Sequence, residues 1–113
     1  MDEASGARCE NLCDRLQRQY PGRVPVIFAT DNRAIAMSKR KFLVPSSICI
    51  AQLVHVLRQH VGIDPSESLF IMTEDGVIPP ATLLMDAVYA AHRRHADGML
   101  HLFYNVENTF GGG

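Results

Sequence analysis

The side chains best suited to chemistry in this sequence are its three cysteines. Cys9 and Cys13 lie four residues apart, about one helical turn, so both thiols could face a single metal ion. A closed zinc site needs four ligands, and no nearby Cys or His completes such a set. Cys49 stands beside a packed strand, where a cysteine is far more often a core residue than a nucleophile. We therefore predict free, half-buried thiols and no metal site.

Two histidines, His92 and His95, bracket Arg93-Arg94 at the end of a predicted helix. Positive groups are favoured there by the helix dipole, so this cluster is interpreted as a helix-terminal one. The sequence contains no G-x-S-x-G motif, no phosphate-binding loop and no paired acidic motif. We predict that the protein is not an enzyme.

The C-terminal end carries a different kind of chemical signal. After a polar stretch, Asn105 to Phe110, the sequence stops at Gly111-Gly112-Gly113. Glycines lack side chains, so such an end can thread a narrow channel and present its carboxylate to an activating nucleotide or a thiol. Ubiquitin-like modifiers need this shape, although a frayed or added end would look the same.

Composition limits the class of protein. The 113 residues are 47% hydrophobic and 20% charged, enough for one compact core. The formal net charge of -1 argues against a nucleic-acid partner. An odd number of cysteines, no signal peptide and no run of about 18 apolar residues predict a cytoplasmic protein.

Apolar periodicity and turn residues predict an α+β fold. We expect a disordered start over 1–6, one domain over 7–105 and a flexible tail over 106–113. The predicted elements are helix 7–20, strands 23–28 and 39–45, helix 50–61 with Cys49 and Gly62 at its ends, strand 69–73, helix 82–92 and strand 99–104. This order fits a ubiquitin-like β-grasp with an extra N-terminal helix, although periodicity alone does not select it over other α+β folds.

The strand over 39–45 combines cations, apolar side chains and proline. Phe42 and Val44 point to one face while Lys41 and Leu43 point to the other. Apolar residues on both faces favour a core strand, whereas three leading cations and the closing Pro45 favour an edge. An edge strand with apolar side chains beside open backbone groups can accept another strand.

Several segments together resemble the autophagy ubiquitin-like modifiers, the family of the GABA-receptor-associated protein and the microtubule-associated light chain. The resemblance runs in order over about residues 8 to 111. It is carried by segments 20–27, 39–45, 77–80 and 107–111 and by Leu84-Met85 with Tyr89. It implies a β-grasp domain that a cysteine protease cuts after a glycine. Ubiquitin-like activating and conjugating enzymes would then attach it to phosphatidylethanolamine on the autophagosomal membrane, with no other cofactor.

The resemblance also implies a two-pocket groove for autophagy receptors that carry an aromatic-x-x-aliphatic motif preceded by acids. The first pocket, for the aromatic side chain, would comprise Leu16, Pro25, Lys41, Leu43 and Met99. The second, for the aliphatic one, would comprise Phe42, Val44, Pro45, Ile48, Leu53, Val56 and His60. Cleavage and conjugation would fall at Gly111, after Phe110.

The sequence departs from the family pattern at Leu12, at Ala29-Thr30 and at His60, which stands where the family has arginine. Two alternatives stay open. One is a modifier conjugated to a protein instead of a lipid, which would lack the groove. The other is a β-grasp sulphur carrier, which only Gly112-Gly113 favours.

Overall fold

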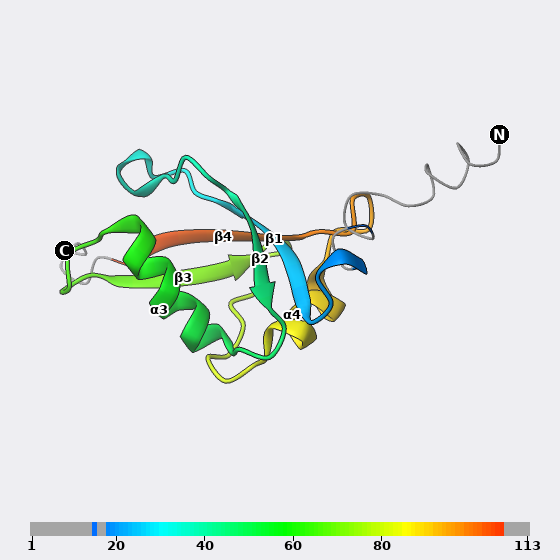
Figure 1. The fold of residues 1–113 in the computed structure, drawn as a ribbon. Helices are drawn as coiled ribbons and strands as arrows, with labels where there is room; N and C mark the ends of the chain where they lie inside the picture. Colours follow the sequence, from blue (N-terminus) through cyan, green and yellow to red (C-terminus); the bar gives the residue numbers. More distant parts are fainter. Residues whose placement is uncertain (1–14, 16–17, 108–113) are drawn as a thin grey trace.

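The computed structural model describes residue 15 and residues 18–107, which form a mixed sheet of four strands with two helices on one face (Figure 1). In chain order the elements are β1 (Arg23–Ala29), the 3-10 turn η1 (Arg33–Ile35), β2 (Lys41–Pro45), α3 (Ile50–Val61), β3 (Ser68–Thr73), α4 (Met85–His92) and β4 (Leu100–Glu107). The strand order is β2-β1-β4-β3, with β1 and β4 parallel at the centre. This is the predicted β-grasp topology. Of the predicted N-terminal helix, Arg15, Arg18 and Gln19 are helical, and the other residues lie outside the described ones.

The core fills the space between the sheet and the two helices. Alternate strand residues face it, and α3 and α4 each add a stripe of buried side chains. The buried members are Val24, Val26, Phe28, Val44, Leu69, Ile71, Leu100, Leu102 and Tyr104 from the sheet and Ile50, Leu53, Leu57, Met85, Val88 and Tyr89 from the helices. Tyr104 also donates its buried hydroxyl to the carbonyl of Ile35 (2.8 Å), which fixes the β1–β2 connection. No helix among residues 15 and 18–107 is long and apolar enough to cross a membrane.

Both ends of α3 lie where the sequence predicts them. Cys49 is the N-cap residue, and its backbone N–H donates to the side-chain oxygen of Gln52 (2.9 Å). Gly62 ends the helix in the left-handed conformation, with φ 62°, and its N–H donates to the carbonyl of Arg58 (3.1 Å). These caps set where α3 begins and where it ends.

The strand β2 is an edge strand, so the edge interpretation of the basic segment is confirmed. Phe28 N–H donates to the carbonyl of Arg40 (2.9 Å). Hydrogen-bonded positions recur at every second residue of an antiparallel pair, so Phe42 also turns its backbone groups toward β1. Lys41 and Leu43 turn theirs toward the open edge. The strand itself begins at Lys41, two residues later than predicted.

The proline in β1 suggested an edge or a strand start, and only the second interpretation is right. Pro25 lies opposite Leu43, a position that does not hydrogen-bond to β2. Pairing with β4 begins one residue later, at Val26 opposite Leu100. Pro25 therefore precedes the part of β1 that has strands on both sides, where its missing N–H would leave a partner unpaired.

The helix α4 begins at Met85, three residues later than predicted, because the preceding segment serves α3. Ile50 N–H donates to Leu83 O and Ala51 N–H donates to Ala81 O, each at 2.9 Å. Leu84 forms a bridge with Cys49. These bonds satisfy the first N–H groups of α3 and keep this segment from coiling.

The last strand, β4, continues to Glu107 instead of ending at Tyr104. Val106 lies opposite Leu69 and Glu107 opposite Ser68. The strand thus extends two residues into the segment predicted as the tail, 106–113. Residues 108–113 and the predicted disordered segment 1–6 lie outside the described residues.

Candidate ligand groove

An apolar cavity with a volume of about 230 Å³ lies between β2 and α3. It brings together all seven residues assigned to the second pocket. Its lining comprises Phe28, Phe42, Leu43, Val44, Pro45, Ile48, Leu53, Val56, Leu57 and His60. The sequence assignment missed Phe28 and Leu57, which are core residues that reach the cavity floor.

Aromatic packing holds the cavity open. The ring of Phe42 lies edge-on to Phe28, with centroids 5.6 Å apart, and Phe28 packs in the same manner against Tyr104 at 6.2 Å. On its other side Phe42 meets the His60 ring at 5.6 Å. Val56 is 43% exposed and stands at the mouth. A rigid apolar cavity that opens to solvent suits an aliphatic side chain, and each buried methylene stabilises such a complex by about 0.8 kcal/mol.

A second, more polar hollow of about 390 Å³ is lined by Lys39, Lys41, Phe42, Leu43 and Met99. Of the residues assigned to the first pocket, Lys41, Leu43 and Met99 line this hollow. Pro25 is less than 2% exposed and is not among the lining residues, and Leu16 lies outside the described residues. Lys39 lines the hollow although the assignment omitted it, and its place in the basic run is the signal that could have found it.

Leu43 joins the two hollows, because it lines both of them. Its backbone faces the open edge of β2, where its carbonyl accepts a hydrogen bond from Arg23 Nη1 at 3.2 Å. The open backbone groups of β2 thus lie between an apolar cavity and a cation-rimmed hollow. An extended peptide could pair with β2 and place two side chains in the hollows, which is the geometry of β-strand addition.

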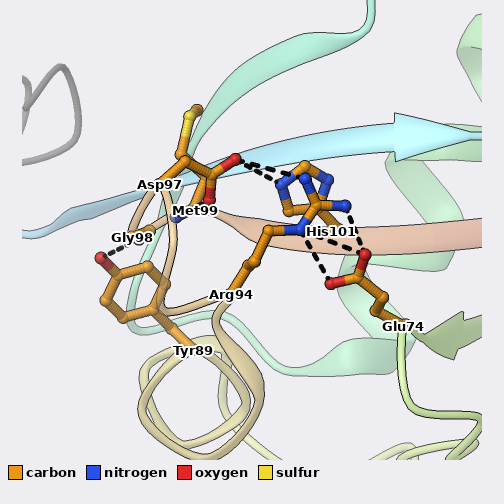
Figure 2. A network of polar contacts seen from close by, with 7 residues as sticks. All are labelled: Glu74, Tyr89, Arg94, Asp97, Gly98, Met99 and His101. Atoms are coloured by element: carbon orange, nitrogen blue, oxygen red, sulfur yellow. Dashed lines mark hydrogen bonds and ion pairs between the residues drawn. The ribbon is translucent and has the colours of Figure 1, made fainter.

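A network of polar side chains holds Met99 at the floor of the more polar hollow (Figure 2). The carboxylate of Asp97 accepts a hydrogen bond from Met99 N–H (2.9 Å) and contacts His101 Nε2 (2.8 Å). Arg94 N–H donates to the carbonyl of Met99 (2.8 Å). Burial acts to raise the pKa of Asp97, but the hydrogen bonds from Met99 and His101 hold it below its ordinary value.

The network continues to the end of β3 and to α4. The Arg94 guanidinium is paired with the carboxylate of Glu74, and its hydrogen bond lowers the pKa of Glu74. Tyr89 donates its hydroxyl to the carbonyl of Gly98 (2.7 Å). These contacts, all visible in Figure 2, tie α4, the turn after β3 and the start of β4 together.

The predicted histidine cluster lies where α4 ends, at His92. His92 Nδ1 is 3.2 Å from the carboxylate of Asp75, which also accepts a hydrogen bond from the Thr73 hydroxyl (2.6 Å). The hydroxyl is the main cause that lowers the pKa of Asp75. Because the carboxylate separates hydroxyl and imidazole, His92 is not placed to activate Thr73 as a nucleophile.

Other predicted chemistry falls mostly outside the described part of the chain. Cys49 is a half-buried free thiol, whereas Cys9 and Cys13 are not described. Among residues 15 and 18–107, no three His, Cys, Asp or Glu side chains are placed to hold a metal ion. Phe110 and Gly111 also lie outside, so their assignment as the cleavage and conjugation site stays a prediction.

A mixed sheet with a parallel central pair, a hairpin edge and a helix packed across one face defines a ubiquitin-like β-grasp protein. Residues 8–111 match the family described as autophagy protein Atg8, ubiquitin-like. The chain belongs to this Atg8 family, as the resemblance of its motifs implied.

Relatives and a solved structure support the assignment over nearly the whole chain. Autophagy-related protein 8 of Schizosaccharomyces pombe is 34% identical over 112 residues, which cover 97% of this chain and 91% of that protein. Its namesake from Mycosarcoma maydis is 37% identical over 100 residues, covering 87% and 83%. The crystal structure of Trypanosoma brucei ATG8 superposes with a TM-score of 0.77 at 28% identity, covering 95% of this chain and 89% of that one.

Proposed function

We propose that this ubiquitin-like modifier of autophagy recruits receptors by binding their aromatic-x-x-aliphatic motifs in the groove along β2. The observation that carries the proposal is the apolar cavity between β2 and α3, which adjoins the edge of β2 that has no partner strand in the sheet. The aliphatic side chain of the motif enters this cavity, and the aromatic one enters the hollow above Met99.

The expected affinity is moderate. Two buried anchors contribute roughly 1.5–3 kcal/mol each, and a few backbone hydrogen bonds add about 1 kcal/mol net each. Association itself costs at least about 4 kcal/mol, and part of the remaining gain is lost in ordering the peptide. At most about 5 kcal/mol then remains, which corresponds to a dissociation constant of roughly 0.2 mM or weaker, as suits a reversible adaptor.

A matched pair of α3 variants tests the groove. Val56 lines the apolar cavity and His55, its neighbour on the helix, does not. Both residues are exposed, so neither Val56→Arg nor His55→Arg should unfold the domain. Titration calorimetry with an acid-flanked Trp-x-x-Leu peptide should show loss of binding for Val56→Arg and near-native binding for His55→Arg. Native affinity in Val56→Arg would overturn the proposal.

We further propose that the chain is conjugated through Gly111 to phosphatidylethanolamine. The match to the Atg8 family runs to Gly111, and β4 delivers the chain to this end of the sheet at Glu107. A cysteine protease would cut after Gly111, and activating and conjugating enzymes would pass its carboxyl group to the lipid amine. The cytoplasmic protein would then be held on the autophagosomal membrane, because two acyl chains anchor stably where one is marginal.

Two glycine variants separate this site from its neighbours. Gly111→Ala should remain unlipidated in starved cells while still binding the peptide in vitro, whereas Gly113→Ala should be processed and lipidated normally. Membrane flotation and intact mass of the modified form provide the readout. Lipidation of Gly111→Ala would place conjugation elsewhere. A protein adduct would support the protein-conjugated alternative, and the mass of a thiocarboxylate would support the sulphur carrier.

A further inference from the structure

A third hollow adjoins the apolar cavity and differs from it in character. It has a volume of about 400 Å³ and is lined by Ala36, Met37, Ser38, Lys39, Phe42 and His60. Phe42 and His60 line both this hollow and the apolar cavity. A peptide whose aliphatic side chain fills the cavity therefore places a neighbouring residue beside His60.

Two basic groups flank the Phe42 ring in this hollow. Lys39 Nζ lies 4.9 Å from the ring centroid on one side, and the His60 ring lies edge-on at 5.6 Å on another. His60 Nδ1 is 3.1 Å from the carbonyl of Val56, the separation expected when Nδ1 carries the proton. In that tautomer Nε2 takes up the second proton when the ring becomes charged.

The other charged groups near His60 on the described elements are engaged or turned away. On α3, Arg58 donates to the carbonyl of Glu67 (2.7 Å). Beyond the helix, Asp64 accepts hydrogen bonds from Ser66. On β2, Lys41 points to the opposite face of the strand. Lys39, from the β1–β2 connection, is the lysine that lines this hollow together with His60, and its charge favours an anion there.

We propose that His60 makes peptide binding in the groove sensitive to pH, so that peptides with a carboxylate beside the aliphatic anchor bind more tightly in acid. The inference rests on the proposed groove and adds a regulated anion subsite to it. Histidine side chains change charge between about pH 5 and 8, while aspartate stays ionised and lysine stays charged throughout. Protonation of His60 therefore adds one attractive charge to a contact that Lys39 supplies at every pH.

The experiment compares two peptides at about pH 5.5 and about pH 8, within the titration range of histidine. One is a Trp-x-x-Leu peptide with aspartates beside the leucine, and the other has serines in their place. For the native chain we expect the aspartate peptide to bind about two- to fivefold more tightly at the lower pH, the range of an exposed charge pair. The serine peptide should show no such gain, which controls for acid effects on the fold.

Variants assign the effect to the ring. His60→Gln should remove the pH dependence, whereas His55→Gln, which changes another exposed histidine of α3, should retain it. Equal pH dependence of the two peptides, or its survival in His60→Gln, would overturn the proposal. Failure of the native chain to bind either peptide at both pH values would instead overturn the proposed groove.

Discussion

Leu43→Ala probes the junction of the groove, because the Leu43 side chain lines both hollows and its backbone faces the open edge of β2. The substitution removes three carbons, and complete burial of each would contribute about 0.8 kcal/mol. Leu43 is already half-buried in the free protein, so only part of this area is newly covered by a ligand. We expect a loss of about 1–2 kcal/mol in binding, a factor of roughly 5 to 30 in the dissociation constant.

Titration calorimetry with the Trp-x-x-Leu peptide measures this loss, and thermal unfolding checks that the variant is folded. Ile78→Ala is the matched control, because Ile78 is 62% exposed and lines neither hollow. It removes as many carbons and should leave the affinity unchanged. If folded Leu43→Ala bound within twofold of the native chain, the peptide would not lie along β2.

Two further predictions concern the framework that supports the groove. Tyr104→Phe removes the buried 2.8 Å hydrogen bond to Ile35 O and should lower the free energy of unfolding, measured by urea denaturation, by about 1–3 kcal/mol. Tyr20→Phe, at an exposed site, is the control and should change the free energy of unfolding little. The hydrogen bond from Arg94 lowers the pKa of Glu74. The Glu74–Arg94 pair therefore contributes stability above the ordinary pKa of a glutamate, and this contribution is lost as the pH falls through the lowered pKa of the folded state. The melting temperature of Glu74→Gln should therefore fall less than that of the native chain between about pH 7 and pH 3.5, and equal falls would contradict this role.

All seven residues that the family resemblance assigned to the second pocket line the cavity between β2 and α3. Its lining comes from two neighbouring segments with clear periodicities, a strand of period two and a helix of period 3.6. Phe42 and Val44 share one face of β2, while Leu53, Val56 and His60 lie three or four residues apart on α3. Once a helix crosses an edge strand, these faces must meet.

The rest of the site depends on contacts between segments that are distant in the sequence. Pro25 could not be recognised as buried from its own strand, since its surroundings come from elsewhere in the chain. The sequence also mispredicted the first residue of α4 and the last residue of β4, for the same reason. Hydrogen bonds to Ile50 and Ala51 hold the segment before α4 extended, and pairing with β3 carries β4 through polar residues. Local propensity, which considers only the residues of the segment itself, takes neither of these partner segments into account.

The nearly neutral total charge conceals a local asymmetry that matters for the groove. Lys39, Arg40 and Lys41 are all exposed along the entry to β2, whereas Glu74 lies in the network at the far end of β3. Lysines on an edge strand oppose pairing with the same edge of a second copy, because like charges would be brought together. The same cations attract an extended peptide that carries acids. One short basic run can therefore oppose pairing of the open edge with a second copy and also favour acidic peptide ligands. Added salt should weaken both the repulsion and the attraction.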